Sequence, residues 1–268
     1  MIEMTETPTA DSAEIARPMF SGVAPCWEAE NVALYQGDCL DIMQGFQTSV
    51  DCIITDPPYC SGGVSEASRS QAKGQGLRSE NIGRFGWFVG DNMGTAGLVW
   101  LLRNVALECH RLLNKNGSLL MFCDWRMIPN IVPAIESVGF RYQNLITWDK
   151  GNMGLGNGFR CRHEQIMHMT AGSPEYYHKG TGNVITCKRV SAEERQHQTQ
   201  KPVDLMVQLA NVVCPPGGTV LDPFMGSAST GVACIRTNRK FIGIEKGAEN
   251  FDTARNRIEK EIAQGRLW

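Results

Sequence analysis

The sequence predicts a single α/β domain built on a doubly wound, mostly parallel sheet. Predicted strands alternate with predicted helices along the chain, as a parallel sheet requires, because each crossover between parallel strands takes a helix. The 268 residues are enough for one large domain. A hydrophobic content of 42% with 20% charged residues is typical of a globular chain and excludes a disordered one.

The individual elements follow from the spacing of apolar residues and from the turn residues between them. Strands are expected at 32–36, 50–55, 118–123, 141–148, 164–169, 219–221 and 240–244, and helices at 39–46, 98–113, 128–138, 202–213, 229–237 and 248–263. Asn116-Gly117 is expected to end the helix over 98–113. Residues 171–196 are polar and lack periodicity, so we expect an irregular segment there.

Domain organisation is predicted to be simple. Residues 1–25 carry three prolines among small polar residues and are expected to form a flexible arm before a domain over 26–268. No apolar run approaches the roughly 18 residues of a membrane span, and the acidic start lacks the apolar segment of a signal peptide. The ten cysteines include no C-x-x-C pair, which indicates reduced thiols, no metal site and a cytoplasmic protein.

Charge is distributed unevenly along a chain whose net charge is −2. Residues 1–56 carry ten acidic side chains and one basic one, whereas 60–90 have a net charge of +2 and 150–201 of +4. Basic segments in an otherwise acidic protein are expected where one face meets phosphates. Solvated loops with no partner are the alternative interpretation.

The strongest motif is Asp56-Pro57-Pro58-Tyr59, directly after the apolar strand at 50–55. Ligands of open α/β sheets bind at the carboxyl ends of strands. The two prolines make a rigid turn that presents a carboxylate, a free carbonyl and an aromatic face. Such a set suits an exocyclic aromatic amine: Asp56 and the Pro57 carbonyl accept its hydrogens, Asp56 stabilises the developing positive charge, and Tyr59 stacks on the ring.

A second motif runs from the strand at 219–221 through Asp222 and a turn of small residues into a helix. Such a turn lets the backbone approach a ligand at a helix N-terminus. Glu245 follows Gly226 by 19 residues and ends the next strand, where an acidic side chain accepts hydrogen bonds from ribose hydroxyls. The combination predicts a nucleoside-type cofactor.

Together the two motifs resemble the S-adenosylmethionine-dependent amino-methyltransferases of DNA. The order of the motifs, with the catalytic one first, is similar to the β group and to its adenine-N6 members, and the resemblance spans about 30–268. It implies a Rossmann-like methyltransferase fold, S-adenosylmethionine as cofactor, and double-stranded DNA whose target base is flipped out of the duplex. Homodimers are common in the group, so a homodimer is a candidate assembly.

The resemblance also implies roles for single residues. Asp56, Pro57, Pro58 and Tyr59 form the catalytic turn, Asp38 and Cys39 contact the adenine of the cofactor, and Lys201 faces its methionine end. The expected cofactor contacts are Asp38, Cys39, Asp56, Thr199, Lys201, Asp222, Pro223, Phe224, Gly226, Ser227, Ala228, Glu245 and Lys246. Where the family usually has a second glycine, this chain has Ala228, and we expect a negative φ there because alanine disfavours conformations that glycine allows.

DNA is expected to meet a loop over 60–97 and a short target-recognition segment over 171–196. The expected contacts are Arg69, Lys73, Arg78, Arg84, Lys188 and Arg189. A recognition segment of 26 residues offers few side chains for base contacts, which predicts loose sequence specificity. The alternatives are cytosine-N4 methylation, whose enzymes usually carry serine in place of Asp56, an RNA or protein-amide substrate, and a non-catalytic DNA-binding subunit.

Overall fold

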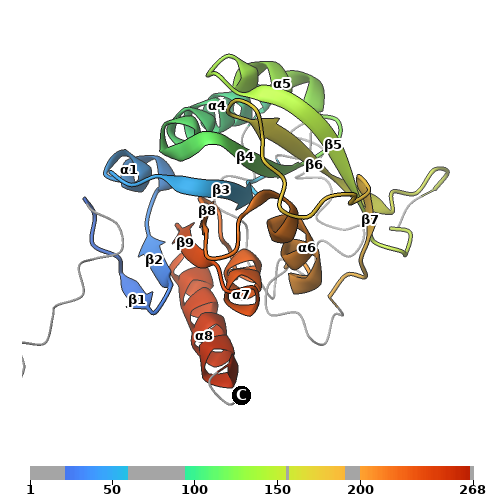
Figure 1. Cartoon of the computed structure of the whole chain (residues 1–268). Coiled ribbons are helices and arrows are strands. Elements are labelled where there is room, and N and C mark those ends of the chain that lie inside the picture. The colour runs from blue at the N-terminus through green and yellow to red at the C-terminus, as the bar shows by residue number, and fades with distance from the viewer. Residues whose placement is uncertain (1–21, 60–93, 155–156, 191–199, 266–268) are drawn as a thin grey trace, which may run out of the picture.

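A computed structural model describes residues 22–59, 94–154, 157–190 and 200–265 (Figure 1). Nine strands in this part of the chain form one sheet in the order β1-β2-β9-β8-β3-β4-β6-β5-β7. The strands are β1 (Trp27–Ala29), β2 (Val32–Gln36), β3 (Val50–Thr55), β4 (Leu113–Cys123), β5 (Arg141–Asp149), β6 (His163–Thr170), β7 (Val184–Thr186), β8 (Thr219–Asp222) and β9 (Lys240–Glu245).

Helices cover both faces of the sheet, as Figure 1 shows. On one face α1 (Cys39–Gln44), α4 (Thr95–Leu112) and α5 (Ile128–Glu136) enclose the first apolar core. On the other, α6 (Val203–Val213), α7 (Ser229–Arg236) and α8 (Ala248–Gly265) enclose the second. Five of the eight strand pairings described are parallel. The predicted doubly wound, mostly parallel sheet is therefore confirmed.

The antiparallel pairings concentrate at one end of the sheet. Strand β6 pairs antiparallel with both β4 and β5, so β6 begins beside the carboxyl end of β4 and runs away from it. The short β7 then adds to β5 in parallel. Neither β7 nor β1 was expected from the sequence, because three-residue strands carry too little periodicity to be recognised.

Both predicted ends of α4 are wrong. The helix begins at Thr95, inside the loop expected over 60–97 and before the start expected at 98. Helix α4 ends at Leu112 and β4 begins at Leu113, whereas the sequence predicted that Asn116-Gly117 ends the helix and that the strand starts at 118. Asn116 has a φ of 79°, and its N–H donates to the carbonyl of Ala171 at 2.7 Å. Its side-chain oxygen accepts from the Ser173 N–H at 3.1 Å. The Asn-Gly pair thus contacts the residues that follow β6 instead of capping a helix.

The order of the strands reverses between β3 and β8, which are neighbouring parallel strands. The chain leaves β3 through α4 on one face, and it leaves β8 through α7 on the other. The carboxyl ends of adjacent strands at such a switch point open a crevice that holds ligands. Both sequence motifs lie at this place. Among the described residues, no helix combines the length and the apolarity that crossing a membrane requires.

Candidate active site

Asp56 begins the turn that follows β3. Its Oδ2 accepts a hydrogen bond from the Nζ of Lys201, the residue two positions before α6. Its Oδ1 is buried and is the one buried side-chain polar atom of the described residues that has no hydrogen-bond partner. Burial raises the pKa of the Asp56 carboxyl, although the Lys201 ammonium opposes this shift. An unsatisfied buried acceptor costs free energy, so the geometry indicates a site prepared for a donor.

Lys201 is enclosed by the site. Its side chain is 7% exposed, and its Nζ lies 4.9 Å from the centroid of the Phe122 ring and 5.5 Å from that of Tyr59. Burial alone opposes protonation, but the carboxylates of Asp56 and Glu164 outweigh it and raise the pKa of the Lys201 ammonium. The group therefore stays charged, as a buried cation does when it is paired.

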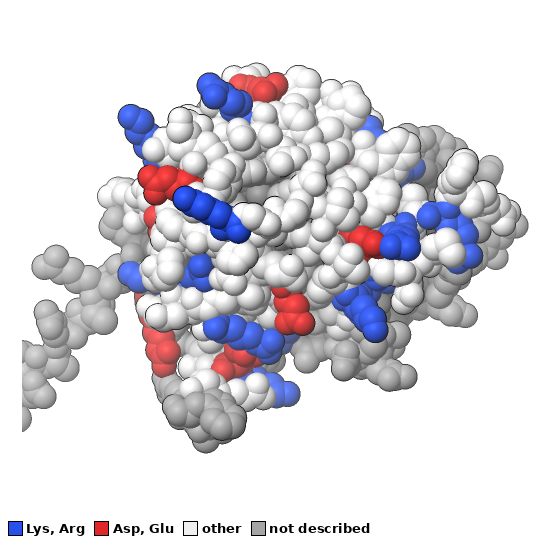
Figure 2. Space-filling model, turned by 45° about the vertical axis from the view of Figure 1, so that its right-hand side comes forward, with Lys and Arg blue, Asp and Glu red and all other residues white. Residues whose placement is uncertain are grey.

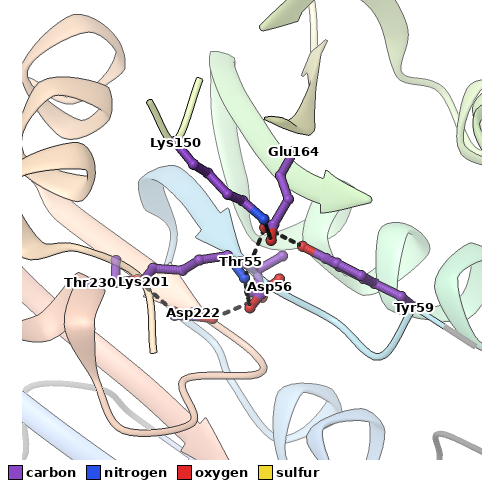
Figure 3. Close-up of polar contacts among 8 residues, drawn as sticks. All are labelled: Thr55, Asp56, Tyr59, Lys150, Glu164, Lys201, Asp222 and Thr230. Atoms are coloured by element: carbon purple, nitrogen blue, oxygen red, sulfur yellow. Dashed lines mark hydrogen bonds and ion pairs between the residues drawn. The ribbon is translucent and has the colours of Figure 1, made fainter. Parts of the chain in front are cut away.

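Glu164, at the start of β6, connects the other polar groups of the site. It accepts from the Tyr59 hydroxyl at 3.2 Å and lies 3.3 Å from the Lys201 Nζ through Oε2, and its Oε1 pairs with Lys150 at 2.5 Å (Figure 3). Burial opposes its ionisation, but the two ammonium groups prevail and hold the pKa of Glu164 at about 2. Burial, and then the Asp56 and Glu164 charges, raise the pKa of Tyr59 well above its usual range.

Asp222 joins the two motifs at the end of β8. Its Oδ1 accepts from the Thr55 hydroxyl at 2.8 Å and from the Phe224 N–H at 3.1 Å, and its Oδ2 accepts from the Thr230 hydroxyl at 2.7 Å. Burial raises the pKa of Asp222 to about 7 despite these donors. Asp222 thus holds the turn after β8 to the end of β3.

The turn after β8 contradicts one expectation. Ala228 has a φ of 56° and a ψ of 43°, in the left-handed region, so the predicted negative φ is wrong. Its N–H donates to the Met225 carbonyl at 2.7 Å, and Arg257 donates to both the carbonyl and the hydroxyl of Ser227. These tertiary contacts force a conformation that alanine alone disfavours. At Gly226, with a φ of 51°, an added Cβ would meet open space, which leaves room for a ligand.

The carboxyl ends of β9 and β2 complete this side of the crevice. Glu245 accepts from the N–H groups of Gly226 at 3.1 Å and Gly247 at 2.7 Å, and burial raises the pKa of its carboxyl. Asp38 accepts from the Leu40 N–H at 3.0 Å and pairs with Lys246 at 3.0 Å. Carboxylates therefore follow two strands that pair side by side, an arrangement suited to the hydroxyls of a ribose.

The structure gathers most of the predicted site residues into two neighbouring clusters. Asp56, Tyr59 and Lys201 form the one predicted to be catalytic, which also includes Glu164 and Lys150. The other follows β8, β9 and β2 and contains Asp38, Cys39, Asp222, Pro223, Phe224, Gly226, Ser227, Ala228, Glu245 and Lys246.

The other predicted contacts lie elsewhere. Lys188 and Arg189 are exposed just after β7, and among the described residues neither side chain bonds to a member of either cluster. The neighbouring Cys187 N–H, however, donates to the carbonyl of Asp149 at 3.0 Å. Thr199, Arg69, Lys73, Arg78 and Arg84 lie outside the described residues. Sequence reasoning missed Glu164, Lys150, Thr55 and Thr230. The one sequence signal for a role of Glu164 was its charge at the start of the apolar strand predicted over 164–169.

Comparison with known proteins places these motifs in a family. The model described as DNA methylase, N6_N4_Mtase, matches residues 50–256. The chain is 27% identical over 266 residues to the type II methyltransferase M2.MboI of Moraxella bovis, across 89% of this chain and 92% of that protein.

Solved structures give the same answer for the fold. The M1.HpyAVI complex with SAM superposes with a TM-score of 0.63 at 28% identity, over 85% of this chain and 98% of that one. The cytosine-N4-specific PvuII DNA methyltransferase superposes with a TM-score of 0.69 at 16% identity, over 91% and 94%. The family model covers well over half of the sequence, and the chain therefore belongs to the N6/N4 family of DNA methylases.

Proposed function

We propose that the protein is a DNA adenine-N6 methyltransferase that uses S-adenosylmethionine and acts on an adenine flipped out of double-stranded DNA. The observation that carries the proposal is the unpartnered, buried Oδ1 of Asp56 in the Asp-Pro-Pro-Tyr turn. The amino group of a base supplies the missing donor. Because that group cannot reach a methyl donor inside the duplex, the base has to leave the stack.

The cofactor cluster fits S-adenosylmethionine. The open space at Gly226 admits a ligand to the backbone, and Glu245 and Asp38 offer acceptors for hydroxyl and amine hydrogens. Carboxylates gathered at the switch point also favour a ligand that carries positive charge. A related protein, M1.HpyAVI, is known in complex with SAM, which supports the same assignment here.

The chain's residues orient the amine and receive its proton. When bound, the cofactor supplies an electrophilic methyl group: the S–C bond breaks as the N–C bond forms, and the electron pair stays on sulfur. Asp56 and the Pro57 carbonyl accept the two amine hydrogens, which directs the nitrogen lone pair toward the donor. As positive charge develops on nitrogen, the Asp56 carboxylate stabilises it and takes the surplus proton.

A hairpin next to the site supplies a DNA-facing surface. Residues 150–162 connect β5 to β6, and Phe159 is fully exposed beside the exposed Arg160. Figure 2, which brings the side of this hairpin forward, shows Lys and Arg side chains spread over the face in view. We assign phosphate contacts to Arg160, Lys188 and Arg189, and stacking on an unpaired base to Phe159.

Transfer of tritium from labelled S-adenosylmethionine to unmethylated duplex DNA, followed by mass spectrometry of the nucleosides, tests the proposal. N6-methyladenine is the expected product. N4-methylcytosine would identify the alternative favoured by the fold likeness to the PvuII enzyme. Absence of transfer, with DNA binding intact, would identify a non-catalytic subunit.

The proposed loose sequence specificity is tested by mapping the modified adenines in random-sequence DNA. Modification confined to one motif of at least four bases would overturn it.

A further inference from the structure

Glu164 stands at the centre of the polar groups around Asp56, yet no step of the proposed reaction uses it. Its carboxylate contacts the Tyr59 hydroxyl at 3.2 Å, the Lys201 Nζ at 3.3 Å and the Lys150 Nζ at 2.5 Å. Figure 3 shows these three groups converging on it from separate elements. A carboxylate that is 22% exposed and holds two ammonium groups is fixed in place by its partners.

Lys201 is shared between two carboxylates. It hydrogen-bonds Asp56 and lies within ion-pair distance of Glu164, while Phe122 and Tyr59 cover its ammonium. The Oδ2 of Asp56 is therefore occupied before any substrate arrives. A neighbouring ammonium also makes a carboxylate a weaker proton acceptor. Both effects hinder Asp56 in accepting the hydrogens and the proton of the amine, unless the Lys201 ammonium can move to another acceptor.

We propose that Glu164 is a positioning residue for methyl transfer: it takes over the ammonium of Lys201 when the target amine docks on Asp56, and it holds the Tyr59 ring by its hydroxyl. This inference rests on the proposed function. Lys201 moves only from one acceptor to another within the same cluster, so it never becomes an unpaired buried charge. Asp56 then regains a free Oδ2 beside its free Oδ1, so its carboxylate can accept the amine hydrogen that the Pro57 carbonyl does not hold and can take the surplus proton. Lys150 keeps Glu164 in place during the exchange.

The test compares Glu164→Gln with Glu261→Gln in the full-length protein. Glu261 is a matched control, because it also holds a cation, Arg236 at 2.6 Å, but on α8, outside both clusters and the expected DNA-binding segments. The single-turnover rate on unmethylated DNA measures the chemical step without product release, and calorimetry measures the Kd for S-adenosylmethionine. For Glu164→Gln we expect a rate about 10²-fold lower with the Kd within about threefold of wild type. The control is expected to match wild type in both.

The dependence of this rate on pH separates positioning from a merely structural role. The charged and titratable groups around Asp56 are Lys201, Glu164 and Tyr59, and the carboxyl of Asp222 also lies close enough to interact with its charge. Because the Glu164 charge contributes to raising the pKa of Asp56, its removal is expected to move the acid limb of the profile to lower pH. An unshifted limb with a rate within about threefold of wild type would overturn the inference.

Glu164→Asp covers the case in which the glutamine variant does not fold. The shorter side chain keeps the negative charge but places the carboxylate farther from the Lys201 ammonium. We therefore expect a single-turnover rate about tenfold lower than that of wild type. A wild-type rate in this variant would also contradict the inference. If the wild-type protein transfers no methyl group to DNA, the proposed function fails; if it does and the Glu164 variants match it, only this inference fails.

Discussion

Thr55 donates a 2.8 Å hydrogen bond to Asp222 across 167 positions of the sequence. Thr55 ends β3 and leads directly into the catalytic turn, and Asp222 ends β8 and leads into the turn at Gly226. The bond therefore fixes the distance between Asp56, the proposed acceptor of the amine, and the turn at Gly226 that is proposed to approach the cofactor. Such distances decide the rate of a direct transfer, since a displacement of about 1 Å costs on the order of 10²-fold.

Replacement of Asp56 by Asn is expected to abolish transfer but not binding. Loss of a preorganised charge acceptor lowers the rate by about 10²–10³-fold or more. Lys201 keeps Glu164 at 3.3 Å as a partner, so the fold is expected to persist. Single-turnover kinetics and calorimetric titration with S-adenosylmethionine check both parts. Near-normal turnover in a folded variant would exclude the role of Asp56.

Glu245→Ala is expected to weaken S-adenosylmethionine binding by roughly 1–3 kcal/mol, the cost of leaving polar ligand groups without a partner. The variant also releases the N–H groups of Gly226 and Gly247, which loosens the turn itself. Glu249→Ala, an exposed change in the first turn of α8, is the matched control. Equal calorimetric affinities of the two variants would argue against a cofactor role for Glu245.

Asp222 predicts a particular pH dependence of stability. Its pKa rises from an ordinary 3.8 to about 7 on folding, so between these values the folded protein binds more protons than the unfolded chain. The contribution of Asp222 to the free energy of unfolding therefore falls as pH rises through this window, and it is constant above it. Asp222→Asn removes the titration.

Urea unfolding at about pH 4.5 and pH 7.5 measures this effect. We expect the stability of Asp222→Asn relative to wild type to increase with pH, by up to about 1.4 kcal/mol per unit. Parallel curves for wild type and Asp222→Asn would show that Asp222 is ionised in the folded protein.

Ala228 is expected to tolerate glycine but not valine. Glycine relieves about 1–2 kcal/mol of left-handed strain and loses about 0.8 kcal/mol from a buried methyl, so the net change is small. Valine adds β-branching to the same strain and overpacks a fully buried position, which costs roughly 1–3 kcal/mol more. Thermal unfolding distinguishes the two, and equal melting temperatures would contradict the left-handed conformation.

The hairpin over 150–162 is expected to bind DNA through charge and stacking. Arg160→Gln removes one phosphate contact, so the slope of log K against log salt is expected to decrease by about 0.9. Phe159→Ala is expected to lower affinity for single-stranded or flipped substrates by about 1–3 kcal/mol with little change in the slope. Arg255→Gln on α8 is the control. Fluorescence anisotropy at several salt concentrations measures all three.

The sequence was sufficient for those features that depend on local pattern. Alternating apolar strands and helices predicted the sheet and its two covered faces, and the Asp56 and Asp222 motifs predicted that ligands bind where the strands before them end. The β5–β6 hairpin was different, because the direction in which a strand pairs is decided by partners far away in the chain. Without that direction, Glu164 and Lys150 had no evident connection to Asp56.

Ala228 illustrates the second limit. Its intrinsic preference for negative φ is real, but Arg257, 29 positions later, holds the carbonyl of the preceding residue and the turn closes on Met225. The hydrogen bonds from Arg257 and the turn bond to Met225 together outweigh a local cost of about 1–2 kcal/mol. The backbone preference of alanine therefore predicted the wrong conformation at this position.

The reversed course of β6 has a consequence for how such a fold can evolve new chemistry. Because β6 runs antiparallel to β4, its first residues lie beside the last residues of β4, and Glu164 reaches the edge where Asp56 stands. With every strand parallel, Glu164 would lie at the opposite edge, about 25 Å away, the length of an eight-residue strand. Strand beginnings as well as strand ends are thus open to mutation and selection at one crevice, which enlarges the set of positions from which a substrate pocket can be remodelled.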